Sequence, residues 1–587
     1  MRRLKGVLLP TLLASCAGPA SEGPIAPSTP AVPVEPARVP APEPLQTPDV
    51  RYAIELVQAD PPLVALHVEC AGDADGDSEF TLSEGWAGIA ETGGDLELVE
   101  ARGADGNLES ERPSSHAWRV RHAPGEPLAL VFELRPTTHR ASAGPPEYYL
   151  PILEPGLLHV LGAQTLPAPT HLDFAAERPI ELSWRGFAEH GWRTISSYAE
   201  GEGPTLVTRS LDAYRHALFL AGDLRLFRGD VHGQPVWIAM SGEWSFPDAE
   251  FTDLATRIVA LGREFFEDFG KPFYLISLIP VGTGERGMTS LGGTGLTDSF
   301  ALFMTPHVTL ERSPGGGDVA WLLAHELFHE WNGQAVTLQQ PEQLGYWFSE
   351  GFTDFYARRL LHRAGLLTLA QYVESWNQKL AVQAANPERN ASAERVREAF
   401  WTDPDVGNLP YQRGDVVALL VDHAIGVRSQ GQRSLDDLMR ELVRRARAGA
   451  EPYSNDQLLA AIGEFAGPET EAAVRAIALE GVDPVLAPDV GGPDLELVPA
   501  DIPVFDTGFD HEATLKNGVV SGVVPGGSAD RAGLADGMRI RSWSVSYGRI
   551  DVPIQVRVAT DAEEREISFL PLGTPVQGYA FRVRDPR

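Results

Sequence analysis

Two short blocks of the sequence contain the residue types of a catalytic zinc site. The first is the run His325-Glu-Leu-Phe-His329, and the second places Glu350 within Trp347-Phe-Ser-Glu-Gly351. Residues four apart in a helix share a face, so the two histidines can hold one metal ion through their imidazole nitrogens. Two histidines and a carboxylate leave a fourth tetrahedral position open, as in catalytic rather than structural zinc sites. We therefore expect one zinc ion per chain and hydrolysis at the open position.

A first helix, predicted over 318–332, must position the two histidines. Asp318 is a suitable N-cap after a Ser-Pro-Gly-Gly-Gly run, and the segment has a broad apolar surface. Gly333 can end the helix in left-handed geometry. Glu326, one step round from His325, would then lie beside the water molecule that the metal activates and could act as a general base.

A second helix is predicted over 347–362. It contains Glu350 and, four residues later, Asp354 on the same face. The alternative is that these are two solvent-exposed charges on a surface helix. The apolar residues around them disfavour that alternative.

Length and composition limit the classes of protein that the chain can belong to. With 587 residues, it is long enough for three or four domains. Its formal net charge of -33 argues against nucleic-acid binding and against docking on anionic lipid through a basic patch. We therefore expect no nucleic-acid partner.

The amino terminus has the features of an export signal. Residues 1–16 begin with three basic side chains, continue as a short apolar run and end in Leu-Ala-Ser-Cys16, which resembles the bacterial lipobox. Residues 17–49 are rich in proline and form a predicted semi-rigid tether. We expect Cys16 to be lipidated and the protein to contact a bacterial membrane through this anchor only, in the periplasm or on the cell surface. The alternative is an ordinary secretory signal with an accidental cysteine.

The remaining chain is predicted to be a multidomain α+β protein. Strand and turn patterns over 50–203 predict an N-terminal all-β domain, and residues 204–485 read as a mixed α/β and then mainly helical catalytic domain. A Pro- and Gly-rich break at 486–504 is interpreted as a linker before a last domain at 505–587.

Acidic residues between Asp73 and Glu84 match alternate positions of a calcium-loop template. Ser78 stands where that template requires glycine, and predicted strands flank the segment. A solvent-exposed hairpin tip is therefore favoured, and calcium binding is left open.

Three ordered blocks resemble the glycyl aminopeptidase family of gluzincin metallopeptidases. The blocks are His325-Glu-Leu-Phe-His-Glu-Trp-Asn332, Trp347-Phe-Ser-Glu-Gly-Phe-Thr-Asp-Phe-Tyr356, and Pro410-Tyr-Gln-Arg-Gly414 leading to Ser434-Leu-Asp-Asp-Leu-Met-Arg440. The resemblance implies an N-terminal β domain, a thermolysin-like catalytic domain and a C-terminal PDZ domain. It also implies that three residues bind zinc: His325, His329 and Glu350.

The same resemblance implies roles for three further residues. Glu326 would be general base and then proton donor. Tyr411 stands at the tyrosine of a related Pro-Tyr-Glu-Lys-Gly motif, where its phenol would hydrogen-bond the oxyanion, a role typically worth about 3 kcal/mol. A packed loop aromatic is the alternative for Tyr411. Asp354 matches an aspartate of thermolysin-like sites and could accept the free imidazole N–H of His325.

The last domain resembles a PDZ domain over residues 518–537, a Gly-Val-Val-Ser-Gly run followed by Ala532-Gly-Leu534. Thr507-Gly-Phe509 is a candidate carboxylate-binding loop. The resemblance implies a peptide ligand bound by strand addition, with a structural or dimerising module as the alternative.

One departure from the family concerns the substrate's free amine. Related aminopeptidases place a glutamate ahead of the zinc helix to bind it, whereas Gly295 stands at that position here, and Glu285 or Asp298 are candidates to replace it. We predict a zinc metallopeptidase for peptide or protein substrates, of aminopeptidase type, with an endopeptidase or another zinc hydrolase as the alternative. A catalytically silent binding protein is disfavoured because every zinc and base position is filled.

Overall fold

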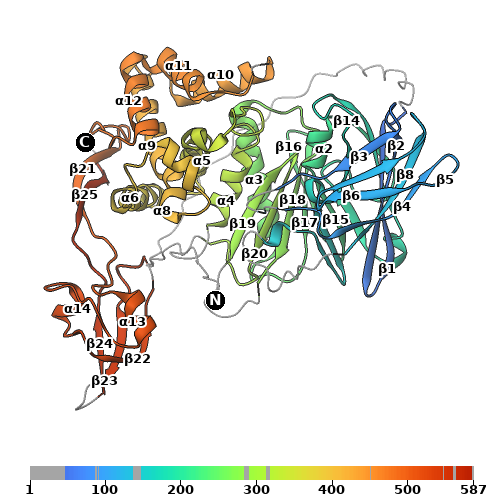
Figure 1. The fold of residues 1–587 in the computed structure, drawn as a ribbon. Helices are drawn as coiled ribbons and strands as arrows, with labels where there is room; N and C mark the ends of the chain where they lie inside the picture. Colours follow the sequence, from blue (N-terminus) through green and yellow to red (C-terminus); the bar gives the residue numbers. More distant parts are fainter. Residues whose placement is uncertain are drawn as a thin grey trace.

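The computed structural model describes most of the chain and shows an α+β architecture with a β-rich N-terminal part followed by a mainly helical part (Figure 1). The described residues are 47–85, 89, 91–135, 147–282, 290–311, 318–449, 451–546, 548–559 and 564–584. The predicted signal, Cys16 and nearly all of the predicted tether lie outside them. None of the helices in these ranges combines the length and apolar character needed to cross a membrane.

The N-terminal part contains a seven-stranded sheet in the order β14-β12-β1-β2-β8-β4-β5. Its strands are β1 (Val50–Ala59), β2 (Pro62–Ala71), β4 (Leu96–Gly103), β5 (Gly106–Asn107), β8 (Pro127–Leu134), β12 (Arg178–Arg185) and β14 (Thr205–Arg209). A four-stranded sheet packs against it: β11 (Ala168–Pro169), β3 (Asp77–Thr81), β7 (Ala117–Arg121) and β6 (Ser110–Ser114). Trp118 of β7 meets Phe132 of β8 edge to face at 5.2 Å in the shared core. Buried residues alternate with partly exposed ones along β8, as expected for a strand with one face in the core.

A third sheet joins the N-terminal part to the catalytic part. It has the order β13 (Arg193–Ser196), β15 (Leu218–Gly222), β10 (Leu157–Leu161) and β9 (Ile152–Glu154). The predicted boundary at 203 is wrong here, because β14 pairs with β12 and β15 pairs with β10. β15 is buried on both faces: Phe219 lies in the N-terminal core, and Leu220 lies in a core shared with the catalytic sheet. The chain therefore returns to the N-terminal sheets after the turn that sequence reading took as their end.

The catalytic sheet has five strands in the order β16 (Arg225–Val231), β17 (Gln234–Met240), β18 (Leu275–Pro280), β20 (Ser299–Met304) and β19 (Leu291–Leu296). β17, β18 and β20 run parallel, and β16 and β19 are antiparallel edges. Alternate residues of β18 face different cores: Leu275 faces the N-terminal sheets and Ile276 faces helices α3 (Asp248–Phe266) and α4 (Val319–Phe328). The order β17, α3, β18 agrees with the mixed α/β pattern expected for the start of residues 204–485.

Helices dominate the rest of the catalytic part. They are α5 (Tyr346–Arg363), α6 (Leu369–Ala385), α7 (Ala393–Ala399), α8 (Pro404–Gly407), α9 (Leu409–Arg428), α10 (Leu435–Arg447), α11 (Asn455–Ala466) and α12 (Pro468–Glu480), with the short 3-10 helix η3 (Glu342–Gly345) before α5. Capping boxes at Thr368 and Ser434 start α6 and α10. Helix α12 starts with Pro468 at its first position, where proline is well suited because its fixed φ fits the helix and the missing N–H has no partner there.

The predicted linker at 486–504 is also wrong. It contains β21 (Leu495–Ile502), which pairs along its whole length with β25 (Val576–Val583). Leu495, Leu497 and Phe581 lie in the same core as the catalytic helices. Proline and glycine at the ends of this segment suggested a linker, but its alternating apolar residues pair with a strand about eighty residues later.

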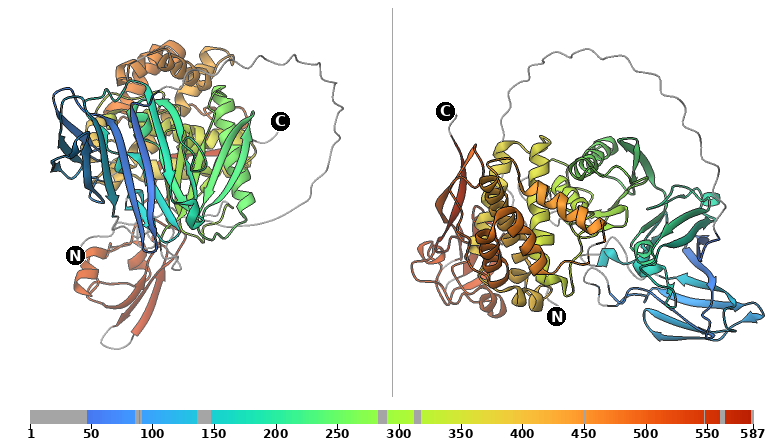
Figure 2. Two further views of the ribbon diagram at one scale, coloured as in Figure 1. Left: turned by 90° about the vertical axis from the view of Figure 1, so that its right-hand side faces the viewer. Right: turned by 90° about the horizontal axis from the view of Figure 1, so that it is seen from above.

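A small C-terminal module lies between β21 and β25 in the chain. It comprises α13 (His511–Asn517), α14 (Ser528–Arg531) and the three-stranded sheet β22 (Arg539–Ser544), β23 (Ile554–Ala559) and β24 (Glu564–Phe569), around its own apolar core. Thr507 donates to the carbonyl of Phe509 within the candidate carboxylate-binding loop. The PDZ assignment stays a prediction. Figure 2 shows the N-terminal sheets and the C-terminal strands at opposite ends of the molecule, with the catalytic helices between them.

Candidate active site

Helix α4 holds the first site residues. Asp318 caps it as predicted by accepting a hydrogen bond from the Trp321 amide. The helix ends at Phe328 rather than at 332, and His329 is its C-cap residue. Gly333 has φ 155° rather than the left-handed helical value expected of it. The chain turns early because the His329 carbonyl accepts from the Gln334 amide and the His329 ring donates to the Asn332 carbonyl.

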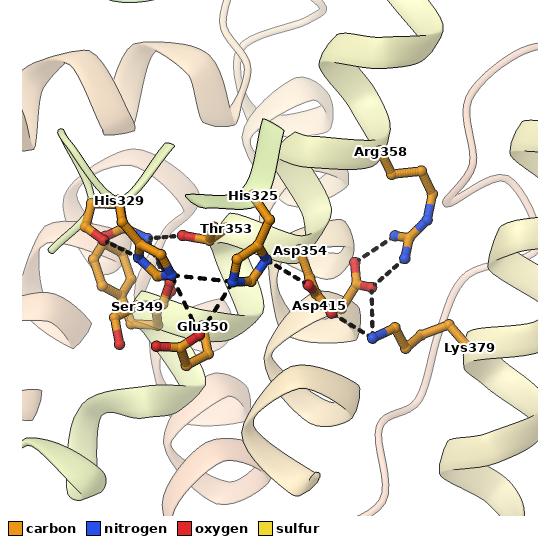
Figure 3. Close-up of polar contacts among 11 residues, drawn as sticks. His325, His329, Ser349, Glu350, Thr353, Asp354, Arg358, Lys379 and Asp415 are labelled. Carbon is orange, nitrogen blue, oxygen red and sulfur yellow. Dashed lines mark hydrogen bonds and ion pairs between the residues drawn. The ribbon is translucent and has the colours of Figure 1, made fainter. Parts of the chain in front are cut away.

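His325, His329 and Glu350 bring three metal-ligand atoms together (Figure 3). The two Nε2 atoms are 3.1 Å apart, and the Glu350 Oε2 lies 3.4 Å from that of His325 and 3.5 Å from that of His329. Three ligand atoms around a tetrahedral zinc ion with bonds of about 2.0–2.1 Å are themselves about 3.3 Å apart. The residues present therefore fit a zinc ion.

The histidine rings are also held in the tautomer that zinc needs. His325 Nδ1 is 2.9 Å from Asp354 Oδ1, and His329 Nδ1 is 3.0 Å from the Asn332 carbonyl. Both partners are acceptors, so in the neutral rings each Nδ1 carries the proton and each Nε2 presents its lone pair to the metal position. Asp354 lies on α5, only 1 % exposed, where the sequence predicted it.

Asn332 is a site residue whose role sequence reasoning did not identify. It is fully buried after α4, and its side-chain amide donates to the carbonyls of Phe348 and Ser349 and to the Thr353 hydroxyl on α5. One residue thus orients His329 and fastens the end of α4 to the helix that carries Glu350. The family block ending in Trp-Asn332 contained it, but spacing alone gave it no partner.

Glu326 lies between the metal-ligand group and the edge strand β19. Burial raises the pKa of its carboxyl, the two histidines oppose that shift, and the Gly295 amide donates a hydrogen bond to it. Gly295 therefore contacts the predicted base through its backbone. A Cβ at Gly295 would lie 3.3 Å from the Glu326 carbonyl oxygen, so a side chain there would press on α4.

Two tyrosines of the N-terminal part, Tyr148 and Tyr149, contact β19, and the sequence did not indicate either of them. Tyr149 donates to the Gly293 carbonyl at 2.8 Å. A Cβ at Gly292 would lie 2.1 Å from the Tyr148 hydroxyl, so glycine is required for this approach. Burial, with a smaller contribution from Glu326, raises the pKa of Tyr148 to about 12, so its hydroxyl keeps its proton.

Tyr411 lies in the first turn of α9, which is a helix and not the loop considered as an alternative. Its hydroxyl hydrogen-bonds to Glu350, and its ring lies 6.1 Å from that of His325. Burial and then the Glu350 carboxylate raise its pKa well above the usual value. The phenol is therefore a protonated donor next to the metal-ligand group.

A buried charge network lies behind His325 (Figure 3). Asp354 accepts from Lys379 of α6 through its second oxygen, and Asp415 of α9 accepts from Arg358 of α5 at 2.9 Å. Burial lowers the pKa of His325, but the hydrogen bonds to Asp354 and Glu350 outweigh burial and raise it to about 10 without a metal. No sequence signal pointed to Lys379, which lies on a different helix.

The other predicted sites do not join this group. Asp298 already pairs with Lys271 and Arg209, so it is not a free carboxylate for a substrate amine. Glu285, like Cys16, lies outside the described residues. In the calcium-loop segment, Asp77 and Glu79 face Arg119. Across the part of the chain that is described, three metal-ligand side chains converge only at His325, His329 and Glu350.

The helices that carry this site match a known peptidase family. Residues 318–404 match the family described as M61 glycyl aminopeptidase. This segment is similar to the M61 family, and the chain is a zinc metallopeptidase. The M61 match spans α4 to α7 and so includes the whole of α6 with Lys379. Its helices α4 and α5 and the C-cap of α4 carry five of the predicted residues: His325, Glu326, His329, Glu350 and Asp354. Tyr411 lies just beyond the matched residues.

Solved structures of other proteins have a fold similar to that of this metallopeptidase. An aminopeptidase N family protein from Idiomarina loihiensis shares 17% identity and a TM-score of 0.67, with 92% of this chain and 98% of that chain covered. The M1 zinc metallopeptidase from Deinococcus radiodurans shares 16% identity, with a TM-score of 0.46 and coverage of 74% and 94%. A mutant of the latter bound to a Tyr-Ser-Ala substrate matches with a TM-score of 0.45, 16% identity and the same coverage. No curated protein matches the chain.

Proposed function

We propose that the protein is a zinc-dependent peptidase of aminopeptidase type in which Glu326 is the general base. The observation that carries the proposal is the arrangement of His325, His329 and Glu350 around one point, with Glu326 and Tyr411 on its rim. A zinc ion held by the three ligands would polarise the scissile carbonyl and make an attacking water acidic.

The side chains on the rim would perform the proton transfers. Glu326 would take a proton from the attacking water and deliver it to the leaving amine, a role that fits a carboxyl whose pKa burial raises. Tyr411 would donate its hydroxyl hydrogen to the oxygen of the scissile carbonyl as negative charge develops there. The proposed substrates are peptides or proteins, laid alongside the edge strand β19.

Glu326→Gln tests the catalytic part of the proposal. This variant should bind one zinc ion as tightly as the wild type, while kcat falls by about 10²–10⁴-fold because the general base is lost. Glu374→Gln, an exposed glutamate of α6, is the matched control. An active Glu326→Gln variant would refute this mechanism.

Substrate mode needs its own experiment because the amine-binding glutamate is absent at Gly295. A peptide library in free and amino-terminally acetylated forms separates the two candidates. An aminopeptidase should release single residues from the free peptides only. An endopeptidase or another zinc hydrolase on the same scaffold, the second candidate, would cleave the acetylated peptides internally. This second candidate is supported because Gly295 has no carboxylate and Asp298 is already paired with Lys271, so neither residue can bind a substrate amine.

We also propose that the protein is exported and attached to a bacterial membrane by a lipid on Cys16, with residues 17–49 as a tether. The proposal is supported by the sequence pattern alone. Cys16→Ser should move the protein from the membrane fraction to the soluble fraction. Unchanged fractionation would contradict the anchor. A peptide ligand of the C-terminal module remains a prediction, which titration with peptides bearing free C-termini would test.

A further inference from the structure

We infer that Lys379 is a positioning residue of the zinc site and that the C-terminal strand β25 holds it in place through α6. The inference rests on the proposed role of His325 as a zinc ligand. Lys379 lies outside the three family blocks, and β25 belongs to the last part of the chain.

The Asp354 carboxylate connects Lys379 to His325. One oxygen accepts from His325 Nδ1 at 2.9 Å, and the other accepts from Lys379 Nζ at 2.5 Å. Burial raises the pKa of Asp354, but the Lys379 ammonium and the His325 bond outweigh it and hold that pKa below its usual range. With both oxygens engaged, the carboxylate cannot rotate without breaking a charge-assisted bond. Lys379 therefore fixes the acceptor that orients the His325 ring.

The surrounding charges make Lys379 difficult to replace. Asp354 is 1 % exposed and Asp415 is fully buried, and the two carboxylates share two cations, Lys379 and Arg358. Lys379 Nζ is 4.0 Å from Asp415, so it faces both carboxylates. Without Lys379, two buried negative charges would share one arginine. An uncompensated buried charge is strongly unfavourable, so Asp354 would shift or take up a proton.

Helix α6 is in turn fastened to β25. The Asn377 side chain pairs with the backbone of Phe581 in both directions, donating to its carbonyl at 3.1 Å and accepting from its amide at 2.6 Å. Trp376 meets the Phe581 ring edge to face at 5.9 Å. The Arg358 guanidinium carbon also lies over the Trp376 ring, 4.3 Å from the ring centroid. These contacts link the C-terminal strand to the cations of the network.

The docking is close along the helix. A Cβ at Gly578 would lie 3.0 Å from the Ala384 Cβ, so β25 passes directly over the end of α6. β21 precedes the C-terminal module in the chain and β25 follows it, and the two strands pair with each other. A continuous set of contacts therefore runs from β25 to the zinc site through Asn377, Lys379 and Asp354.

The first test replaces Lys379 and measures zinc affinity by chelator competition. Lys379→Met should weaken zinc binding by about 10–100-fold, the range seen when partners of metal ligands are lost. Lys379→Arg keeps the charge and should recover part of the affinity. Lys516→Met, an exposed lysine on α13, is the matched control and should bind zinc like the wild type.

A double-mutant cycle separates positioning from a general loss of stability. If Lys379 acts through Asp354, then Lys379→Met in an Asp354→Asn background should change zinc affinity by less than about twofold. An equal loss in both backgrounds, or no loss in either, would overturn the inference. A wild-type protein that binds no zinc would instead refute the proposed function, so the two failures are distinguishable.

Asn377→Leu tests the role of β25. This variant removes both hydrogen bonds to Phe581 but leaves Lys379 intact. Amide hydrogen exchange should show faster exchange in β25, and zinc affinity should fall in the same direction as for Lys379→Met. Faster exchange in β25 with unchanged zinc affinity would overturn the connection to the C-terminal strand.

Discussion

Gly351 of α5 and Gly414 of α9 meet backbone to backbone where the two helices cross. A Cβ at Gly414 would lie 1.9 Å from the Trp347 carbonyl oxygen, and one at Gly351 would lie 2.3 Å from the Gly414 Cα. Glu350 immediately precedes one glycine, and Tyr411 lies one turn before the other. The crossing therefore sets the distance between a zinc ligand and the phenol beside it.

Replacing Gly414 with alanine should damage both stability and catalysis. The added methyl group has no room, and overpacking of this kind typically costs about 1–3 kcal/mol of unfolding free energy. The helices must separate, so Tyr411 moves away from Glu350 and kcat falls. Urea denaturation and steady-state kinetics of Gly414→Ala measure the two effects.

Gly426→Ala is the control on the same helix. A Cβ at Gly426 meets nothing within 4 Å, and alanine is a better helix former than glycine. This variant should be stabilised by roughly 0.5–1 kcal/mol, with unchanged kcat. If Gly414→Ala behaves like Gly426→Ala, close helix crossing is not what positions Tyr411.

Tyr411→Phe should reduce turnover without affecting the metal. Loss of one donor to a developing oxyanion typically costs about 10²–10³-fold in kcat. The ring stays, so packing and zinc content should not change. Tyr372→Phe, on α6 and stacked on His362, is a control tyrosine in the same helical part. A Tyr411→Phe variant that changes only KM would assign the phenol to substrate binding.

Local spacing explains which parts of the site could be predicted from the sequence. His325 and His329 are four residues apart, as are Glu350 and Asp354, and one helical turn places each pair on one face. The capping residues Asp318, Thr368 and Ser434 bond within three residues of themselves. Such contacts depend on short stretches of chain, so pattern and chemistry suffice to find them.

Long-range pairing explains what was missed. Lys379 reaches Asp354 only because α6 packs beside α5, and Tyr149 reaches Gly293 across 144 residues of sequence. The two wrong boundaries have the same origin, since β14 and β21 pair with strands that are not next to them in the chain and that composition does not identify. Turns rich in glycine and proline show where an element ends, but not which strand the chain pairs with next.

Zinc binding should release protons at neutral pH. Without metal, the His325 pKa is about 10 and that of His329 is also raised, because the nearby carboxylates outweigh the effect of burial. At least the His325 ring is therefore protonated at pH 7. Zinc takes the neutral imidazole, so binding must displace about one to two protons. Calorimetry in buffers of different ionisation enthalpy measures their number. Asp354→Asn removes the strongest partner of His325 and should therefore lower the number of protons released. Heats of zinc binding to the wild type that do not depend on the buffer would contradict a protonated His325.

His159 should make the protein acid-sensitive at a point remote from the metal. It lies on β10 in the core between the N-terminal and catalytic sheets, 1 % exposed, with Nε2 3.2 Å from the Ser277 hydroxyl of β18. Burial lowers its pKa from 6.5 to about 3, so the folded protein keeps the ring neutral. Between these two pH values the unfolded chain binds one more proton than the folded protein, and stability must fall as pH falls through this window.

The size of the effect follows from the same linkage. One proton contributes about 1.4 kcal/mol per pH unit, so His159 should account for roughly 2 kcal/mol of stability lost between pH 6.5 and 5. Urea denaturation at both pH values should show that the unfolding free energy of His159→Gln falls by roughly 2 kcal/mol less than that of the wild type. His232→Gln, at an exposed turn, should keep the wild-type slope. Equal slopes for His159→Gln and the wild type would mean that the ring takes up its proton inside the fold, which would contradict the lowered pKa of His159.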